Sequence, residues 1–192
     1  MIIGNKSEFA IESEITSAYA KLSLRALGFF VIYLNGQRYG IYSPDATMLA
    51  CSFDEVGDRI ARRGKHIAAF SAEPNAYKIA GAFNRALYAP DQENEQFFGM
   101  PHSDFLHLIK ENHLMWAPDG DAAFDDGSRI LHFDIDGKVR LISFKCCGNE
   151  CMHEFSDLVD AWLKPDEFYG ILQGWHTAFI AEWSVLNEIG TI

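Results

Sequence analysis

The sequence lacks the features that would export, anchor or cross-link a protein. Residues 1–8 contain no positively charged start followed by an apolar run, so we expect no secretory signal. No uninterrupted apolar stretch is long enough to cross a bilayer, and residues 26–34 come nearest to one. Four cysteines, of which Cys146 and Cys147 are adjacent, make a poor disulfide framework for a chain of 192 residues. We therefore expect reduced thiols and a cytoplasmic protein.

Recognisable catalytic motifs are also missing. The chain has no Gly-x-Ser-x-Gly elbow, no glycine-rich phosphate loop, and no His-x-x-x-His or His-Glu-x-x-His pattern among its seven histidines. His132 alternates with apolar neighbours, which predicts a position on the outer face of a hairpin. Asp134 and Asp136 could act as an acid–base pair only inside a cleft, and Asp136 is already accounted for by its turn with Gly137. We predict no enzyme activity and no cofactor.

Two groups of potential metal ligands have unfavourable spacing. Cys146, Cys147, Cys151 and His153 place three thiols and an imidazole within eight residues, which could hold zinc. Structural zinc sites draw paired ligands from two separated segments, however, and no Cys-x-x-Cys or His pair occurs elsewhere in the chain. The acids of residues 119–126 resemble a calcium loop, but an EF-hand needs Gly at its sixth position and Glu at its twelfth. We predict unligated thiols and a solvated acidic loop.

Acidic residues outnumber basic ones, 27 to 16, which gives a formal net charge of −11. Nucleic acids and anionic membranes are bound through Lys and Arg, so we predict neither as a partner. A negative field attracts a basic protein, although net negative charge also serves solubility alone. Apolar residues make up 48% of the chain and aromatic residues 14%, which is typical of a packed globule. We predict one domain over residues 1–192.

Strand patterns are clearest in three places. Residues 9–15 alternate apolar and polar side chains, which predicts a half-buried strand. Residues 29–42 turn at Asn35-Gly36 and residues 130–145 turn at Asp136-Gly137, and both dipeptides tolerate the positive φ angles of a type I′ hairpin turn. We predict an α+β fold in which an antiparallel sheet, built from two β-hairpins plus an N-terminal strand, packs against helices.

Helix signals follow each hairpin. Ser52 and Glu55 have the spacing of a capping box for a helix that ends at Gly64. A second helix is predicted over residues 74–89, and Ser103 is the predicted cap of a short third one.

The pattern of the C-terminal region predicts two further helices. Apolar residues recur at helical spacing over residues 155–163, and Pro165 ends that helix and begins a Trp-rich C-terminal helix with an apolar face over residues 168–186. The helical spacing of Trp162, Trp175 and Trp183 indicates a place in the core.

Two polar loops are the predicted binding surfaces, because surface loops commonly carry function. Residues 90–101 also contain Phe97 and Phe98, which we expect to be exposed. The acidic residues of the two loops are Asp91, Glu93, Glu95, Asp119, Asp121, Asp125 and Asp126.

Several segments together have a sequence pattern that is typical of a known family. They are residues 1–12, Gly36-Gln-Arg-Tyr-Gly, residues 116–128, residues 139–145 and the final Trp-rich helix. In these segments the chain resembles a bacterial family of polymorphic-toxin immunity proteins, immunity protein forty-two, over essentially its whole length. The resemblance implies a cytoplasmic antitoxin that blocks the active domain of a secreted or contact-delivered toxin by direct binding. It supplies no binding residues and does not identify the toxin.

Three functions follow from these observations. In the first, an immunity protein turns its acidic loops toward a basic toxin surface, such as the cleft of a nuclease. In the second, a small metal-dependent enzyme uses the cluster at residues 146–153 or the acidic loop. In the third, the chain is an interaction module for another complex, with no toxin involved.

Overall fold

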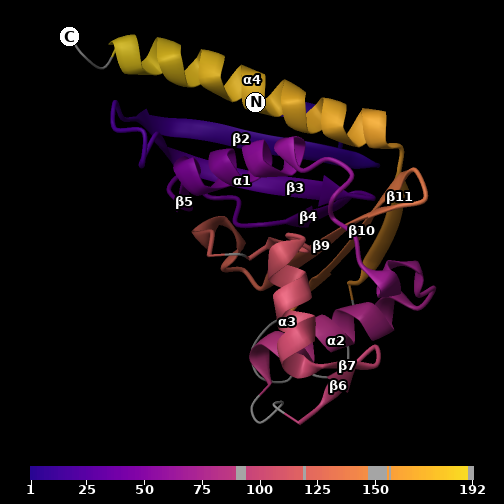
Figure 1. The fold of residues 1–192 in the computed structure, drawn as a ribbon. Coiled ribbons are helices and arrows are strands. Elements are labelled where there is room, and N and C mark those ends of the chain that lie inside the picture. Colours follow the sequence, from indigo (N-terminus) through magenta and orange to yellow (C-terminus); the bar gives the residue numbers. More distant parts are fainter. Residues whose placement is uncertain (90–93, 119, 147–154, 156, 190–192) are drawn as a thin grey trace.

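The computed structural model describes residues 1–89, 94–118, 120–146, 155 and 157–189 (Figure 1). Two antiparallel sheets form its centre, and helices cover them at both ends of the molecule. The predicted α+β class is confirmed. The two predicted hairpins, however, belong to separate sheets and not to one.

The first sheet has the strand order β1-β2-β3-β4, with β5 also paired to β3. Its strands are β1 (Ile2–Asn5), β2 (Phe9–Ala18), β3 (Ala26–Leu34), β4 (Gln37–Tyr39) and β5 (Thr47–Met48). The turn between β3 and β4 has positive φ at Asn35 (49°) and Gly36 (82°), as a type I′ turn requires. The first predicted hairpin is therefore confirmed.

The second sheet has the strand order β11-β10-β9-β8. Its strands are β8 (Met115–Ala117), β9 (Ser128–Ile135), β10 (Lys138–Lys145) and β11 (Val159–Leu163). Positive φ at Asp136 (48°) and Gly137 (70°) closes the second predicted hairpin. A small ribbon of β6 (Gln96–Phe97) and β7 (Met100–Pro101) lies apart from both sheets.

In the described part of the chain, four α-helices surround these sheets, with two short 3-10 turns between elements. The helices are α1 (Leu49–Ala61), α2 (Ala76–Tyr88), α3 (His102–Glu111) and α4 (Pro165–Ile189), and the turns are η1 (Ala69–Ala72) and η2 (Ala122–Phe124). Helices α1 and α4 pack on the first sheet, whereas α2 and α3 lie at the opposite end of the molecule (Figure 1). Trp175 of α4 also donates a hydrogen bond from Nε1 to Ser13 Oγ of β2 at 2.9 Å.

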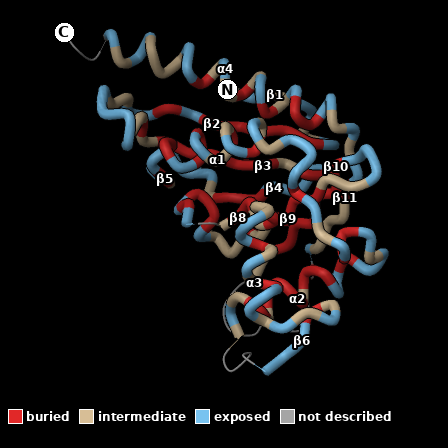
Figure 2. Tube along the Cα trace, in the orientation of Figure 1, coloured by how far each residue is buried: buried red, intermediate tan, exposed pale blue. Residues whose placement is uncertain are grey.

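Two hydrophobic cores lie on opposite faces of the second sheet. Alternate residues of β10 enter each one: Leu141 packs in the core of α1, α4 and the first sheet, and Ile142 packs in the core of α2 and α3. Buried residues accordingly run along the strands and the inner faces of the helices (Figure 2). No helix among the described residues combines the length and apolar character needed to span a membrane.

Several predictions of local structure were wrong where tertiary contacts overrode the local pattern. Helix α1 begins before Ser52 and Glu55, which lie inside it. Asn75 caps α2, accepting a hydrogen bond from the Lys78 N–H at 3.3 Å, and α3 starts one residue before Ser103 with no side-chain cap.

Within the predicted helix over residues 155–163, residues 159–163 instead form the edge strand β11, because pairing with β10 satisfies their backbone groups. Trp162 on this strand is 46% exposed and not in the core, whereas Phe97, expected to be exposed, is 2% exposed and packs in the second core.

Candidate functional site

Hydrogen bonds of Asp121 connect the loop at residues 118–127 to the rest of the fold. Its carboxylate accepts hydrogen bonds from Thr47 Oγ1 of β5 at 2.8 Å, from Ser52 Oγ of α1, and from the Ala123 N–H at 2.9 Å, which caps η2. Asp121 is only 8% exposed. The expectation that this carboxylate lies on the surface is therefore wrong, and Asp121 instead sets the position of its neighbours.

The other predicted acids have different environments. Asp125 is exposed, and no side-chain partner for it occurs among the described residues. Asp126 accepts hydrogen bonds from Lys145 Nζ at 2.8 Å and from the Ser128 N–H at 3.1 Å. Burial opposes ionisation of Asp126, but these bonds and the charge of Lys145 lower its pKa overall.

Glu95 is exposed, and its Oε2 lies 3.8 Å from Arg85 Nη1. In the sequence it is far from the other described acids of the two loops. Asp91, Glu93 and Asp119 lie outside the described residues.

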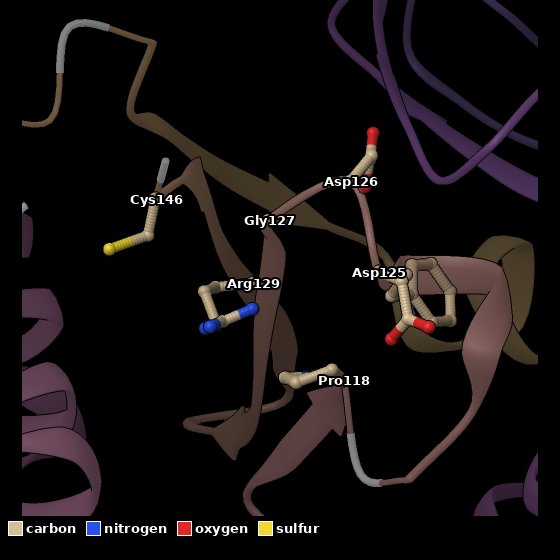
Figure 3. A pocket seen from close by; sticks show the side chains of 7 residues that line it. Pro118, Asp125, Asp126, Gly127, Arg129 and Cys146 are labelled. Atoms are coloured by element: carbon tan, nitrogen blue, oxygen red, sulfur yellow. The ribbon is translucent and has the colours of Figure 1, made fainter. Parts of the chain in front are cut away.

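A pocket of about 450 Å³ opens beside this loop (Figure 3). Asp125 and Asp126 contribute acidic groups to its lining, and Arg129 of β9 contributes a guanidinium. The remaining lining residues are Pro118, Phe124, Gly127 and Cys146. The pocket therefore has charges of both signs in its wall.

Phe124 also lines a second pocket, of about 260 Å³. Three acids of α1, Asp54, Glu55 and Asp58, line this pocket together with the buried Asp121. The aromatic rings of Phe30, Trp116 and Phe124 also line it. The acidic surface thus extends from the loop onto α1.

The acids of α1 differ in how far they are neutralised. Asp54 pairs with Arg25 at 3.2 Å and Glu55 pairs with Arg59 at 2.7 Å. Asp58 is exposed, and within the described part of the chain its carboxylate has no partner. None of the three acids was predicted as a binding residue, although Asp58 follows Asp54 by four residues and Glu55 by three, which places them on one face of a helix.

Near the first sheet's helices, His66, His132 and Asp134 bring three potential ligand atoms within 4.8 Å of one another. His132 is fully buried, so its predicted place on the outer face of the hairpin is wrong; both faces of this sheet are covered. His66 Nδ1 lies 3.0 and 3.1 Å from two backbone carbonyl oxygens, which makes Nδ1 its protonated nitrogen. Arg59 Nη1 lies 3.0 Å from His132 Nδ1, so that nitrogen accepts and the other one carries the proton.

This arrangement favours a hydrogen-bond network over a metal site. A cation at Nε2 of His132 would displace its proton and force an N–H at Nδ1 against the Arg59 donor. Tyr169 of α4 also donates to Asp134 at 3.0 Å. Burial opposes ionisation of Asp134, but its bonds with His132, His66 and Tyr169 lower its pKa overall.

For the predicted cysteine cluster, only Cys146 is described, and its thiol lies 3.6 Å from Asn84 Oδ1. Cys147, Cys151 and His153 lie outside the described residues.

Comparison with known proteins decides the family. The model of the family named immunity protein 42 matches residues 1–178, which is nearly the whole chain. This chain belongs to the immunity protein 42 family. An immunity protein binds and neutralises a cognate toxin, so the predicted family and the predicted function are confirmed.

A similar fold occurs in a solved structure. The crystal structure of CdiI from Burkholderia dolosa AUO158 superposes with a TM-score of 0.59 at 17% identity, covering 93% of this chain and 99% of that one. At this identity the likeness concerns the fold alone. A search of curated protein sequences gave no match. For an immunity protein, the exposed acids and the two pockets beside Phe124 are the candidate toxin-facing features.

Proposed function

We propose that this immunity protein neutralises its toxin by occlusion, with the surface formed by α1 and the loop at residues 120–127 as the contact. We call this surface the acidic face and define it by Asp54, Glu55, Asp58, Asp125 and Asp126. Exposed Asp58 and Asp125 are its two acids without an internal partner in the described chain, and this observation carries the proposal. The protein acts in the cytoplasm, and it acts by binding and not by turnover.

The partner that complements this face is a basic toxin surface, such as the phosphate-binding cleft of a nuclease. Clustered charge accelerates association with a partner of opposite sign, and salt weakens the effect. Glu95, with Asp91 and Glu93, is a less central candidate, since Glu95 pairs with Arg85 at 3.8 Å.

Co-expression with the cognate toxin domain tests the function itself. We expect the immunity protein to restore growth and to co-purify with the toxin. Growth arrest that continues despite stable expression of both proteins would contradict the proposal. Elemental analysis of the protein purified without added metal separates it from a metal-dependent enzyme, which would carry stoichiometric metal.

Charge reversal tests the location of the contact. The double variant Asp58→Lys/Asp125→Lys should slow toxin association by about 10-fold at low salt, with a smaller difference at high salt. The matched control is Glu14→Lys/Glu188→Lys, which makes the same change in net charge at exposed positions on β2 and α4. Stopped-flow association rates check this prediction. Equal slowing by the two double variants would show that net charge matters and the acidic face does not.

A further inference from the structure

Arg129 is an unusual cation within this acidic protein. Its guanidinium lines the pocket beside the loop and lies 4.7 Å from the centre of the Tyr88 ring. No acidic side chain of the described residues lies within ion-pair distance of Arg129. The nearby carboxylate of Asp126 is instead occupied by Lys145, at 2.8 Å.

Among the described residues, few acceptors meet the N–H groups of Arg129. Nη1 donates to the carbonyl oxygen of Ser128 at 3.1 Å, and Nε is buried without an acceptor. A guanidinium carries five N–H donors, and leaving a buried donor unsatisfied is unfavourable. Figure 3 shows Arg129 on the opposite side of the chain at Gly127 from Asp125 and Asp126. The pocket of about 450 Å³ therefore holds a guanidinium whose Nε–H meets no acceptor in the described part of the chain.

We propose that Arg129 receives a carboxylate of the toxin, from an aspartate, a glutamate or the chain terminus. A planar carboxylate matches the guanidinium fork and can accept two hydrogen bonds from it. Asp125 and Asp126 in the same lining disfavour a doubly charged phosphate more than a singly charged carboxylate. This inference rests on the proposed function and adds one requirement: the basic toxin surface carries an acid at this point.

The requirement gives the interface a means of selecting its partner. A toxin that is basic throughout would meet the acidic face but leave Arg129 desolvated against a positive surface, which costs affinity. A toxin that places an acid opposite Arg129 pairs with this cation, while its basic residues pair with the acidic face. Arg129 would thus distinguish the cognate toxin from other basic domains.

Substitution of Arg129 tests this inference, because two explanations predict opposite signs. If only the overall negative field matters, Arg129→Gln should bind a basic toxin faster and more tightly. If Arg129 pairs with a carboxylate, Arg129→Gln should weaken toxin binding by about 10- to 100-fold, and Arg129→Lys should recover part of the loss. The matched control is Arg38→Gln, which removes another arginine stacked on an exposed tyrosine, with 5.1 Å between Arg38 Cζ and the ring centre of Tyr42. Isothermal titration calorimetry measures the affinity of each variant for the toxin, and thermal melting followed by circular dichroism shows whether the variant is folded.

A charge swap identifies the partner acid. Arg129→Glu should lose binding, and a toxin variant with one acid changed to Arg should restore it. Unchanged affinity of Arg129→Gln for a toxin that the native protein binds would overturn the inference and leave the proposed function intact. A native protein that binds no toxin would overturn the proposed function instead.

In that second case the pocket itself remains testable with acetate exchanged against chloride at constant ionic strength. We expect a saturable shift of the Arg129 Nε–H resonance, with the Arg38 resonance unchanged. The absence of a shift at Arg129, or equal shifts at both arginines, would overturn the carboxylate site.

Discussion

Two buried imidazoles illustrate how single residues respond to this fold. The rings of His66 and His132 lie with their centres 4.1 Å apart and their planes tilted by 30°, and neither ring is exposed. Burial lowers the pKa of His66 to about 4, with the Arg59 charge adding to the effect. Burial likewise lowers the pKa of His132 to about 3, against the opposing bond with Asp134. Both rings are therefore neutral at physiological pH.

Stability should consequently fall on mild acidification. An unfolded histidine takes up its proton near pH 6.5, whereas folded His66 does so only near pH 4, so the unfolded state binds more protons between these values. The stability that comes from keeping each histidine neutral is fully present above pH 6.5 and is lost as pH falls. The free energy of unfolding should decrease by about 2 kcal/mol for each histidine between pH 7 and pH 5. Urea denaturation across this range checks the prediction. His66→Phe should reduce the pH dependence, and an unchanged slope in that variant would contradict it.

At the scale of elements, the junction between α1, β5 and the loop at residues 118–127 depends on one carboxylate. Asp121 accepts from Thr47 of β5 and Ser52 of α1 while it caps η2. These contacts join the two parts of the acidic face, since α1 carries Asp58 and the loop carries Asp125. The geometry of the proposed toxin contact therefore depends on a residue that cannot itself reach the toxin.

Removing that carboxylate should cost stability, whereas removing its exposed neighbour should not. Asp121→Ala leaves three donors without their acceptor and should lower the free energy of unfolding by about 2–4 kcal/mol. Asp125→Ala, in the same loop, should change it by less than about 0.5 kcal/mol while weakening toxin association. Chemical denaturation and association kinetics together check the pair. Equal stability of the two variants would contradict the role assigned to Asp121.

At the scale of the whole molecule, the second sheet contributes residues to both hydrophobic cores. Its strands β9 and β10 send neighbouring side chains in opposite directions, with Leu141 in one core and Ile142 in the other. Loss of packing in either core therefore disturbs the same sheet. We propose from this arrangement that residues 1–192 act as one domain.

Truncation on either face of β10 should lower one common transition. Leu141→Ala and Ile142→Ala should each reduce the free energy of unfolding by about 2–5 kcal/mol. Trp116 and Trp175 lie in the core that contains Leu141, so tryptophan fluorescence reports mainly on that side. Coincident fluorescence and far-UV circular dichroism midpoints in Ile142→Ala would support a single cooperative unit. Separate midpoints would show that the cores unfold independently.

Sequence patterns predicted well where the structure depends on neighbouring residues. The turns at Asn35-Gly36 and Asp136-Gly137 need positive φ angles, and those residue types supply them whatever surrounds the hairpin. The start of α4 at Pro165 is local in the same sense, because proline fits the first turn of a helix. The family resemblance likewise rested on segments distributed along the chain.

By itself, then, the sequence determined the α+β class, the two hairpins, the acidic charge and the family. Only the tertiary structure decided that residues 159–163 form a strand, that His132 is buried and that Asp121 faces inward. It also brought the acids of α1 beside the loop and placed Arg129 where no acid of the described residues pairs with it. Each of these outcomes depends on partners tens of residues away, since burial and pairing are properties of contacts that no local pattern contains.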